Sequence, residues 1–228
     1  MEVPHNPDVS WSLIARAAAG ERGARSVFAR GYLPVVRSFL EARWRSTRLA
    51  GEVDDAVQEV FIECLRENGV LSSADPERGD LRGLLYGVTR KVAARFEERV
   101  RKRHSRDQAT GSMLDAVQAR EPSLSIVFDR EWARTLMRLT GDRMRANAEG
   151  GTPGARLRVE LLRLRFAEGM PIRAIAAQWE QDPDAVHRAY AKARAEFKSC
   201  LREVVAEHAV RSEVDLDREV ERVFELLG

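Results

Sequence analysis

Apolar residues recur at helical spacing along nearly the whole chain, and this pattern limits the fold more than any other feature. In residues 52–66 the apolar positions follow the i, i+3, i+4, i+7 repeat of a helix with one buried face. The same repeat appears in residues 81–103 and 155–168. We find no segment with the two-residue alternation that is typical of a half-buried strand. The sequence therefore predicts an all-α fold.

Three stretches interrupt the helical periodicity. Residues 68–80 are rich in Gly, Ser, Pro and Asp and are predicted to form a loop, and residues 147–154 contain a strong turn signal. Residues 104–125 lose clear periodicity and contain Gly, Pro and several Ser. This third break is the longest, and we expect it to separate two domains.

The predicted organisation is two small helical domains joined by a flexible polar linker. The N-terminal domain covers residues 10–103, the linker residues 104–125, and the C-terminal domain residues 126–208. A short amphipathic tail, residues 209–228, follows. The tail either packs back on the second domain or binds a regulator, and its short, regular apolar stripe favours packing.

Composition restricts how such a chain can bind nucleic acid. Charged residues make up 32% of its 228 residues, above the roughly 25% that is typical of soluble domains. The net charge is only +2, however, so a nucleic-acid partner must be recognised by local clusters of cations. The two cysteines, Cys64 and Cys200, fall in apolar helical stripes, and we expect them to be buried thiols rather than a disulfide or a metal site.

No motif in the sequence indicates an enzyme, a cofactor or a metal. It contains no glycine-rich phosphate loop, no metal-ligand spacing and no recognisable nucleophile–base arrangement. The N-terminus has neither the basic start nor the apolar run of a signal peptide. No stretch approaches the ~20 apolar residues that a membrane span needs. We therefore expect a cytoplasmic, non-enzymatic protein with no membrane partner.

The helix predicted over residues 52–66 has an acidic face opposite its apolar face. That face carries Asp54, Asp55, Gln58, Glu59 and Glu63. Taken alone, such a face is most often simply solvated. Catalysis by these carboxylates is disfavoured, because they face outward on a regular helix with no histidine nearby.

The helix predicted over residues 81–103 is basic. Its polar side carries Arg82, Arg90, Lys91, Arg95 and Arg99, and the cluster Arg101, Lys102 and Arg103 ends it. Cations in a row attract phosphates and release counterions, and Tyr86 offers a ring on which an unpaired base can stack. The alternative is a basic helix end that only meets solvent.

The C-terminal half contains the pattern of two helices joined by a tight turn. Gly169 is a natural stop for helix 155–168, and Pro171 suits the first turn of the next helix. Asp182 can cap a third helix that begins at Pro183. That helix is predicted to expose His187, Arg188, Lys192 and Arg194. Such an arrangement suits the reading of a DNA major groove, although an ordinary helical hairpin would look similar.

In this order, the segments resemble the extracytoplasmic-function sigma factors of the sigma-70 family. DDAVQEVFIECL (54–65) is similar to the family's helix that binds core RNA polymerase. LRGLLYGVTRKVAARFEERVRKR (81–103) is similar to the helix that opens and reads the −10 element of the promoter. The stretch 161–197 is similar to the helix-turn-helix that reads the −35 element, with Glu180 where the family usually has a turn glycine.

The resemblance implies a role for each matching residue. Core RNA polymerase would be bound by Asp54, Asp55, Gln58, Glu59 and Ile62. The −10 DNA would be bound by Arg82, Tyr86, Arg90, Lys91, Arg95 and Arg99, with a flipped base held near loop 72–80. The −35 duplex would be bound by His187, Arg188, Lys192 and Arg194. The linker would thread toward the polymerase active centre and the RNA exit path.

Core RNA polymerase and promoter DNA are thus the expected partners, and an anti-sigma factor or another regulator is a further candidate. The main alternative is a free-standing helix-turn-helix regulator that binds DNA without polymerase. It accounts for the C-terminal half equally well, but not for the acidic helix or the basic helix. A helical adaptor that binds no DNA would leave both basic clusters unexplained.

Overall fold

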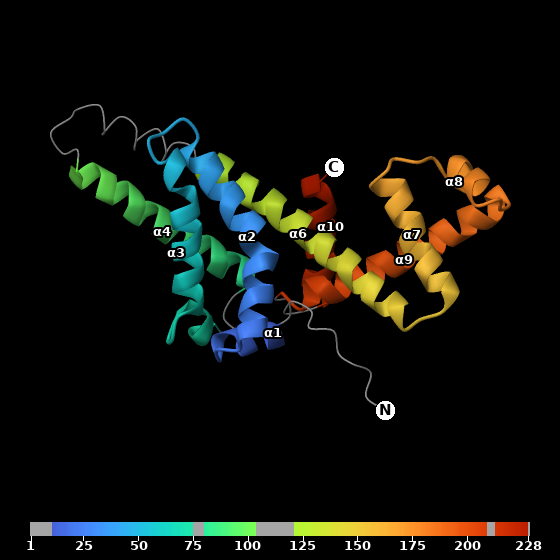
Figure 1. Ribbon diagram of the computed structural model, residues 1–228, viewed down its shortest axis with the longest axis horizontal. Coiled ribbons are helices and arrows are strands. Elements are labelled where there is room, and N and C mark those ends of the chain that lie inside the picture. The colour runs from blue at the N-terminus through green and yellow to red at the C-terminus, as the bar shows by residue number, and fades with distance from the viewer. Residues whose placement is uncertain (1–10, 75–79, 104–120, 209–212, 228) are drawn as a thin grey trace. The chain divides into compact units, whose positions relative to one another are not determined.

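The predicted all-α fold is confirmed by the computed structural model, which describes residues 11–74, 80–103, 121–208 and 213–227. Within these ranges the chain forms nine α-helices and two short 3-10 helices, and no strand (Figure 1). The first helices are α1 (Trp11–Ala18), α2 (Arg22–Trp44), η1 (Ala50–Glu52), α3 (Val53–Leu65), η2 (Val70–Ser73) and α4 (Leu81–Arg103). The later ones are α6 (Glu121–Glu149), α7 (Pro153–Phe166), α8 (Ile172–Gln178), α9 (Pro183–Ala206) and α10 (Glu213–Leu227).

The helices form two compact units whose boundaries fall inside two long helices. Among the described residues, one unit contains those within 11–135 and 205–227, and the other contains residues 136–204. The boundaries therefore lie within α6 and α9. The predicted division was at the linker 104–125, whose residues 104–120 lie outside the described residues. The remainder of that predicted linker is helical, because α6 begins at Glu121.

The larger unit is built around aromatic side chains from several helices. Phe28 and Tyr32 of α2 lie 5.0 Å apart between ring centroids, and Phe28 meets Phe61 of α3 edge-on at 6.1 Å. Trp132 of α6 stacks on Tyr32 at 5.4 Å. Tyr32 also forms a 2.6 Å hydrogen bond with His208, just after α9. These contacts join segments that are far apart in sequence, as a single hydrophobic core requires.

A buried ion pair joins α2 to α4 inside this unit. The guanidinium of Arg43 donates to both carboxylate oxygens of Glu97, at 2.7 and 3.1 Å. The indole N–H of Trp44 donates to the same carboxylate at 2.9 Å. Both charged residues are buried, so the hydrogen bonds must replace the water that each charge has lost.

The smaller unit has its own apolar core between α7, α8 and the first turns of α9. This cluster consists of Leu161, Leu164, Ile172, Ile175, Ala176 and Val186. Leu161 and Leu164 come from α7, Ile172, Ile175 and Ala176 from α8, and Val186 from α9.

Both cysteines are buried free thiols, one in each unit, as predicted. Burial raises the pKa of Cys64 to about 12, and the charge of Glu63 adds to the shift. Burial, followed by the charge of Glu203, also raises the pKa of Cys200. Both groups are therefore protonated and unreactive at neutral pH.

The apolar stripe of α10 is only partly covered. Leu216, Val220 and Val223 are buried, whereas Phe224 and Leu227 remain exposed.

Among the described helices, none is both long and apolar enough to cross a membrane.

Glu97→Ala should lower the free energy of unfolding by about 3–5 kcal/mol, because it leaves the buried guanidinium of Arg43 without its carboxylate. Urea unfolding followed by circular dichroism measures this change. The control is Glu98→Ala, which removes only surface ion pairs with Arg101 and Lys102 and should cost less than about 1 kcal/mol. Equal losses for the two variants would contradict the structural role of Glu97.

Candidate protein and nucleic-acid interfaces

The outer face of α3 is acidic with an apolar centre. Asp54, Asp55 and Gln58 are exposed, Glu59 is half-buried, and the Ile62 side chain is 50% exposed. Ile62 is a single exposed apolar side chain, which adds one apolar contact point to this acidic face. The five residues predicted to bind polymerase therefore lie along one side of one regular helix.

One of these carboxylates has a partner within the chain. Arg37 of α2 donates to Asp54 at 2.6 Å. The pair is exposed, so it contributes little to stability and its charges are screened by salt. For Asp55, no such basic partner is observed among the described residues.

On α4, three of the predicted DNA-binding cations are exposed: Arg90, Lys91 and Arg99. The Arg99 guanidinium lies 4.2 Å from the centroid of the Phe96 ring, and that of Arg90 lies 5.7 Å from the Tyr86 ring. Cation–π contact steadies a guanidinium without neutralising its charge. Both side chains can therefore still bind phosphate.

The other three predicted residues of α4 are held by partners within the chain. Arg95 binds two carboxylates of α3, Glu63 at 2.7 Å and Glu59 at 3.5 Å. The hydrogen bond from Arg95 also lowers the pKa of Glu63, so this carboxylate stays ionised. Arg95 therefore connects the predicted DNA-binding helix to the predicted polymerase-binding helix.

Tyr86 and Arg82 also contact other helices. The Tyr86 ring packs edge-on against Phe39 and Phe128, at 5.6 and 5.0 Å, so part of its surface belongs to the core. Arg82 donates from Nε to Asp129 of α6 at 2.9 Å. For both residues, contact with DNA would first require a rearrangement.

The structure also shows charged residues that the sequence pattern left out. Glu97 lies within the basic sequence of α4, yet it is buried and binds Arg43 and Trp44 of α2. Asp129 of α6 is also buried. The spacing could have indicated both, because Glu97 lies four residues after the buried Ala93 and Asp129 four residues before the buried Ala133.

The turn between α8 and α9 has well-defined caps. Glu180 adopts a left-handed conformation with φ 52°, in the position where glycine is the usual choice. The N–H of Gln181 donates to the Ala176 carbonyl at 2.9 Å, and the N–H of Glu180 donates to Ala177 at 3.2 Å. This pair of bonds satisfies carbonyls that the end of α8 leaves open.

The start of α9 is capped as predicted. The carboxylate of Asp182 accepts a hydrogen bond from the N–H of Ala185 at 3.0 Å, and the helix begins at Pro183. Before α8, Gly169 has φ 69° in the turn that follows α7, three residues after that helix ends at Phe166. Local chemistry therefore accounts for both turns of this unit.

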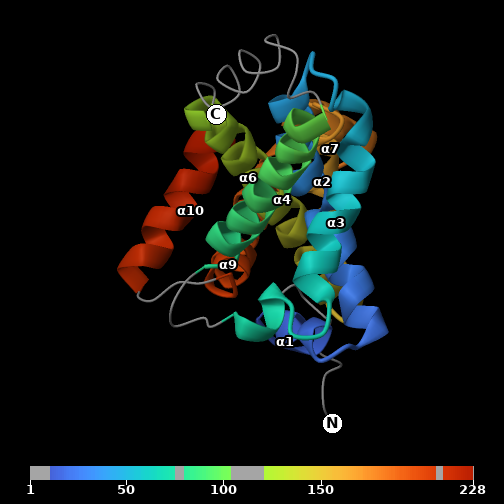
Figure 2. The same cartoon turned by 90° about the vertical axis from the view of Figure 1, so that its left-hand side faces the viewer.

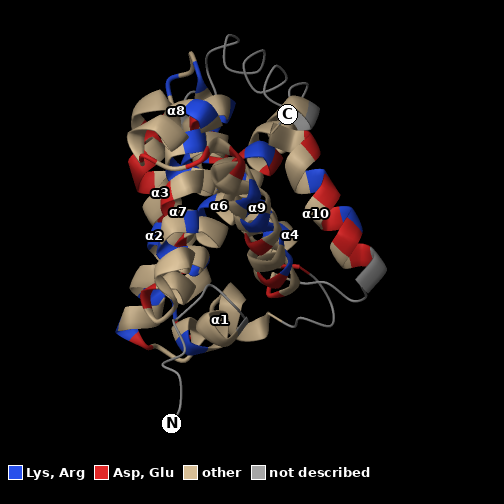
Figure 3. Cartoon of the chain, turned by 90° about the vertical axis from the view of Figure 1, so that its right-hand side faces the viewer, with Lys and Arg blue, Asp and Glu red and all other residues tan. Residues whose placement is uncertain are grey.

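The outer face of α9 is open and basic (Figure 3). His187, Arg188, Lys192 and Arg194 are all exposed, as predicted. Ala191 and Ala195 separate them on the same face. Arg188 approaches Asp182 only to 3.9 Å, and Arg194 lies over the Tyr190 ring at 5.8 Å. Small side chains between cations allow a helix to approach a DNA groove closely.

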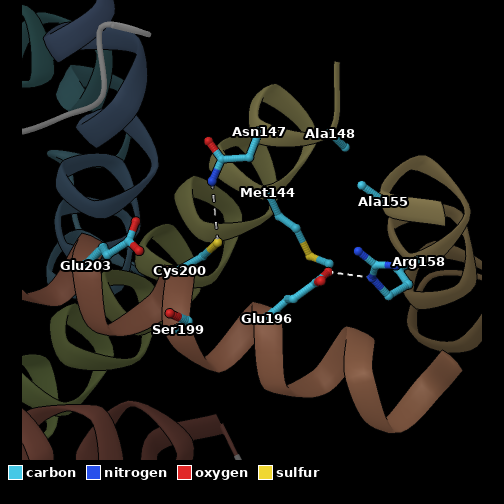
Figure 4. A pocket seen from close by; sticks show the side chains of 9 residues that line it. All are labelled: Met144, Asn147, Ala148, Ala155, Arg158, Glu196, Ser199, Cys200 and Glu203. Carbon is cyan, nitrogen blue, oxygen red and sulfur yellow. Dashed lines mark hydrogen bonds and ion pairs between the residues drawn. The ribbon is translucent and has the colours of Figure 1, made fainter. Parts of the chain in front are cut away.

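A cleft of about 300 Å³ opens beside α9 within the smaller unit (Figure 4). Arg158 and Glu196 pair across it at 2.6 Å, and the Asn147 amide lies 3.9 Å from the Cys200 sulfur. The Cys200 thiol is protonated and no group of three or more metal-binding side chains was found in the described part of the chain. The raised pKa of Cys200 therefore leaves this thiol less reactive than an exposed one.

Comparison with known proteins adds no relative. No protein-family model matches the chain, and no curated protein matches it.

Glu180→Gly should raise the free energy of unfolding of the smaller unit by about 1 kcal/mol, because glycine adopts the left-handed conformation without the Cβ clash. Urea unfolding, followed by a probe in this unit, measures the gain. The control is Gln178→Gly, two residues earlier in the last turn of α8, which should instead cost about 1 kcal/mol. A loss of stability in Glu180→Gly would mean that the glutamate side chain is needed.

Proposed function

We propose that this chain is a sigma factor of the extracytoplasmic-function type, which binds core RNA polymerase and directs promoter recognition and transcription initiation. The observation that carries the proposal is that one chain exposes two surfaces of opposite character. The face of α3 around Ile62 is acidic and apolar, whereas the face of α9 around Arg188 is basic. The first suits a protein partner and the second suits a DNA duplex.

In this proposal each surface has one task. The α3 face binds the polymerase, the exposed cations of α4 follow the separated strands of the −10 element, and α9 reads the −35 element. The polymerase performs the chemistry, so the chain itself supplies binding and orientation only. The site of action would be the cytoplasm, and regulation would come from an anti-sigma factor or another protein.

The free-standing helix-turn-helix regulator remains the second candidate, because the α9 face supports it equally well. The deciding experiment combines the purified chain with bacterial core RNA polymerase and a library of promoter fragments. Initiation from a defined subset of promoters supports the sigma factor. Failure to bind core polymerase, together with tight duplex binding by the chain alone, supports the regulator.

Asp55→Lys should weaken binding to core RNA polymerase roughly tenfold, because it reverses a charge at the edge of the proposed interface. Asp55 is the best position on this face, since Asp54 is already paired with Arg37. The measurement is a titration of labelled chain with core polymerase. Glu225→Lys, an exposed charge reversal on α10, serves as the control and should bind normally. Normal binding by Asp55→Lys would remove this face from the interface.

Arg188→Ala combined with Lys192→Ala should weaken promoter binding and reduce the slope of log affinity against log salt by about 2, one for each lost phosphate contact. The measurement is promoter binding by the reconstituted polymerase over a range of salt concentrations. The control replaces Arg145 and Arg163, which form surface ion pairs with Asp142 and Glu160, and should leave the slope unchanged. An unchanged slope in the first variant would place the DNA contact elsewhere.

A further inference from the structure

Asp129 of α6 is a buried carboxylate that binds two arginines from two other helices. Arg82 of α4 donates from Nε to one carboxylate oxygen at 2.9 Å, and its Nη2 contacts the same oxygen. Arg222 of α10 donates from Nη2 to the other oxygen at 2.9 Å. Arg82, Asp129 and Arg222 all belong to the larger unit, in which α10 lies close to the first half of α6 (Figure 2).

The two arginines differ in how deeply they are held. The side chain of Asp129 is 10% exposed, that of Arg82 is 24% exposed and that of Arg222 is 44% exposed. Arg222 is placed by α10, whose Leu216, Val220 and Val223 are buried. Its other acidic neighbour, Glu219, lies farther away, at 3.9 Å. Asp129 is therefore the main partner of Arg222.

Two arginines share the single carboxylate of Asp129, while Glu219 approaches only Arg222. A buried carboxylate that loses its single partner is strongly destabilised, so a lone arginine on Asp129 could leave only at a high cost. With Arg222 on the second oxygen, Asp129 stays paired when Arg82 leaves. Once released, the Arg82 guanidinium can bind an external anion, such as a phosphate of nucleic acid.

We propose that Asp129 and Arg222 are positioning residues for Arg82, and that Arg222 keeps Asp129 paired while Arg82 moves to a phosphate of the −10 strand. This inference rests on the proposed function, in which Arg82 binds that strand. It assigns α10 a part in DNA binding, because α10 supplies the replacement partner. Without Arg222, Asp129 would hold Arg82 and make it less available to DNA.

The test is a double-mutant cycle in the full-length chain assembled with core polymerase. The probe is a fluorescent single-stranded oligonucleotide from a promoter that the wild type uses. Arg82→Ala should weaken binding roughly tenfold, as expected for one lost charge-assisted bond, and Arg222→Ala should weaken it severalfold. The double variant should bind no worse than Arg82→Ala, because Arg222 acts only through Arg82. Additive losses would overturn the proposal, because Arg222 would then act independently of Arg82.

Two further variants separate positioning from a general effect on folding. Asp129→Asn releases Arg82, so adding Arg222→Ala to it should change DNA binding no further. Arg218→Ala, an exposed arginine on the same helix that approaches Asp215 only to 3.9 Å, should bind like the wild type. Tighter binding by Arg222→Ala would overturn the proposal, because α10 would then obstruct DNA.

A measurement on the free chain keeps this inference separate from the proposed function. Nitrogen-15 NMR reports solvent exchange of the Arg82 Nε–H, which should slow severalfold in Arg222→Ala as Asp129 holds Arg82 more tightly. If the exchange rate is unchanged, Arg82 and Arg222 do not compete for Asp129 and the proposal is overturned, whether or not the chain binds polymerase. If exchange slows but the chain does not bind polymerase, the proposal of a sigma factor is rejected, and the sharing of Asp129 by Arg82 and Arg222 is retained.

Discussion

The larger unit depends on how α4 is fixed between its neighbours. Glu97 turns inward to Arg43 and Trp44 of α2, and Arg95 turns sideways to Glu63 and Glu59 of α3. These bonds set the rotation of α4 about its own axis. Arg90, Lys91 and Arg99 then face outward, so a buried acid indirectly makes the exposed side of the helix more basic. If Glu97 were exposed on the outer face instead, its negative charge would weaken the positive field that this face presents to phosphates.

Much of the fold follows from local sequence signals. The stripes of α3 and α9 predicted which residues are buried and which are exposed, because a helix of regular geometry places its faces by spacing alone. The caps at Gly169 and Asp182 are equally local. The same reasoning predicted the open face of α9, since its exposed cations make few contacts with the rest of the chain.

The surface of α4 was harder to predict, because it depends on contacts between distant segments. Arg82 meets Asp129, and Arg95 meets Glu63, across long stretches of sequence. Nothing in the spacing of α4 distinguishes a cation that binds an internal carboxylate from one that stays in water. The two kinds of cation differ only in whether a neighbouring helix places a carboxylate beside them. The predicted set of six residues on α4 therefore divides into an exposed half and a half held by other helices.

The buried cysteines have a practical consequence. Cys64 lies in the larger unit and Cys200 in the smaller one, and burial keeps both as thiols. Cys64 is 1% exposed, so a thiol reagent reaches its sulfur only when the larger unit opens, whereas Cys200 lines the cleft beside α9. The rate at which Cys64 is modified would therefore report the opening of the larger unit, in the natural sequence and without any attached probe. The chain thus contains its own means of showing whether a partner that binds the smaller unit also stabilises the larger one.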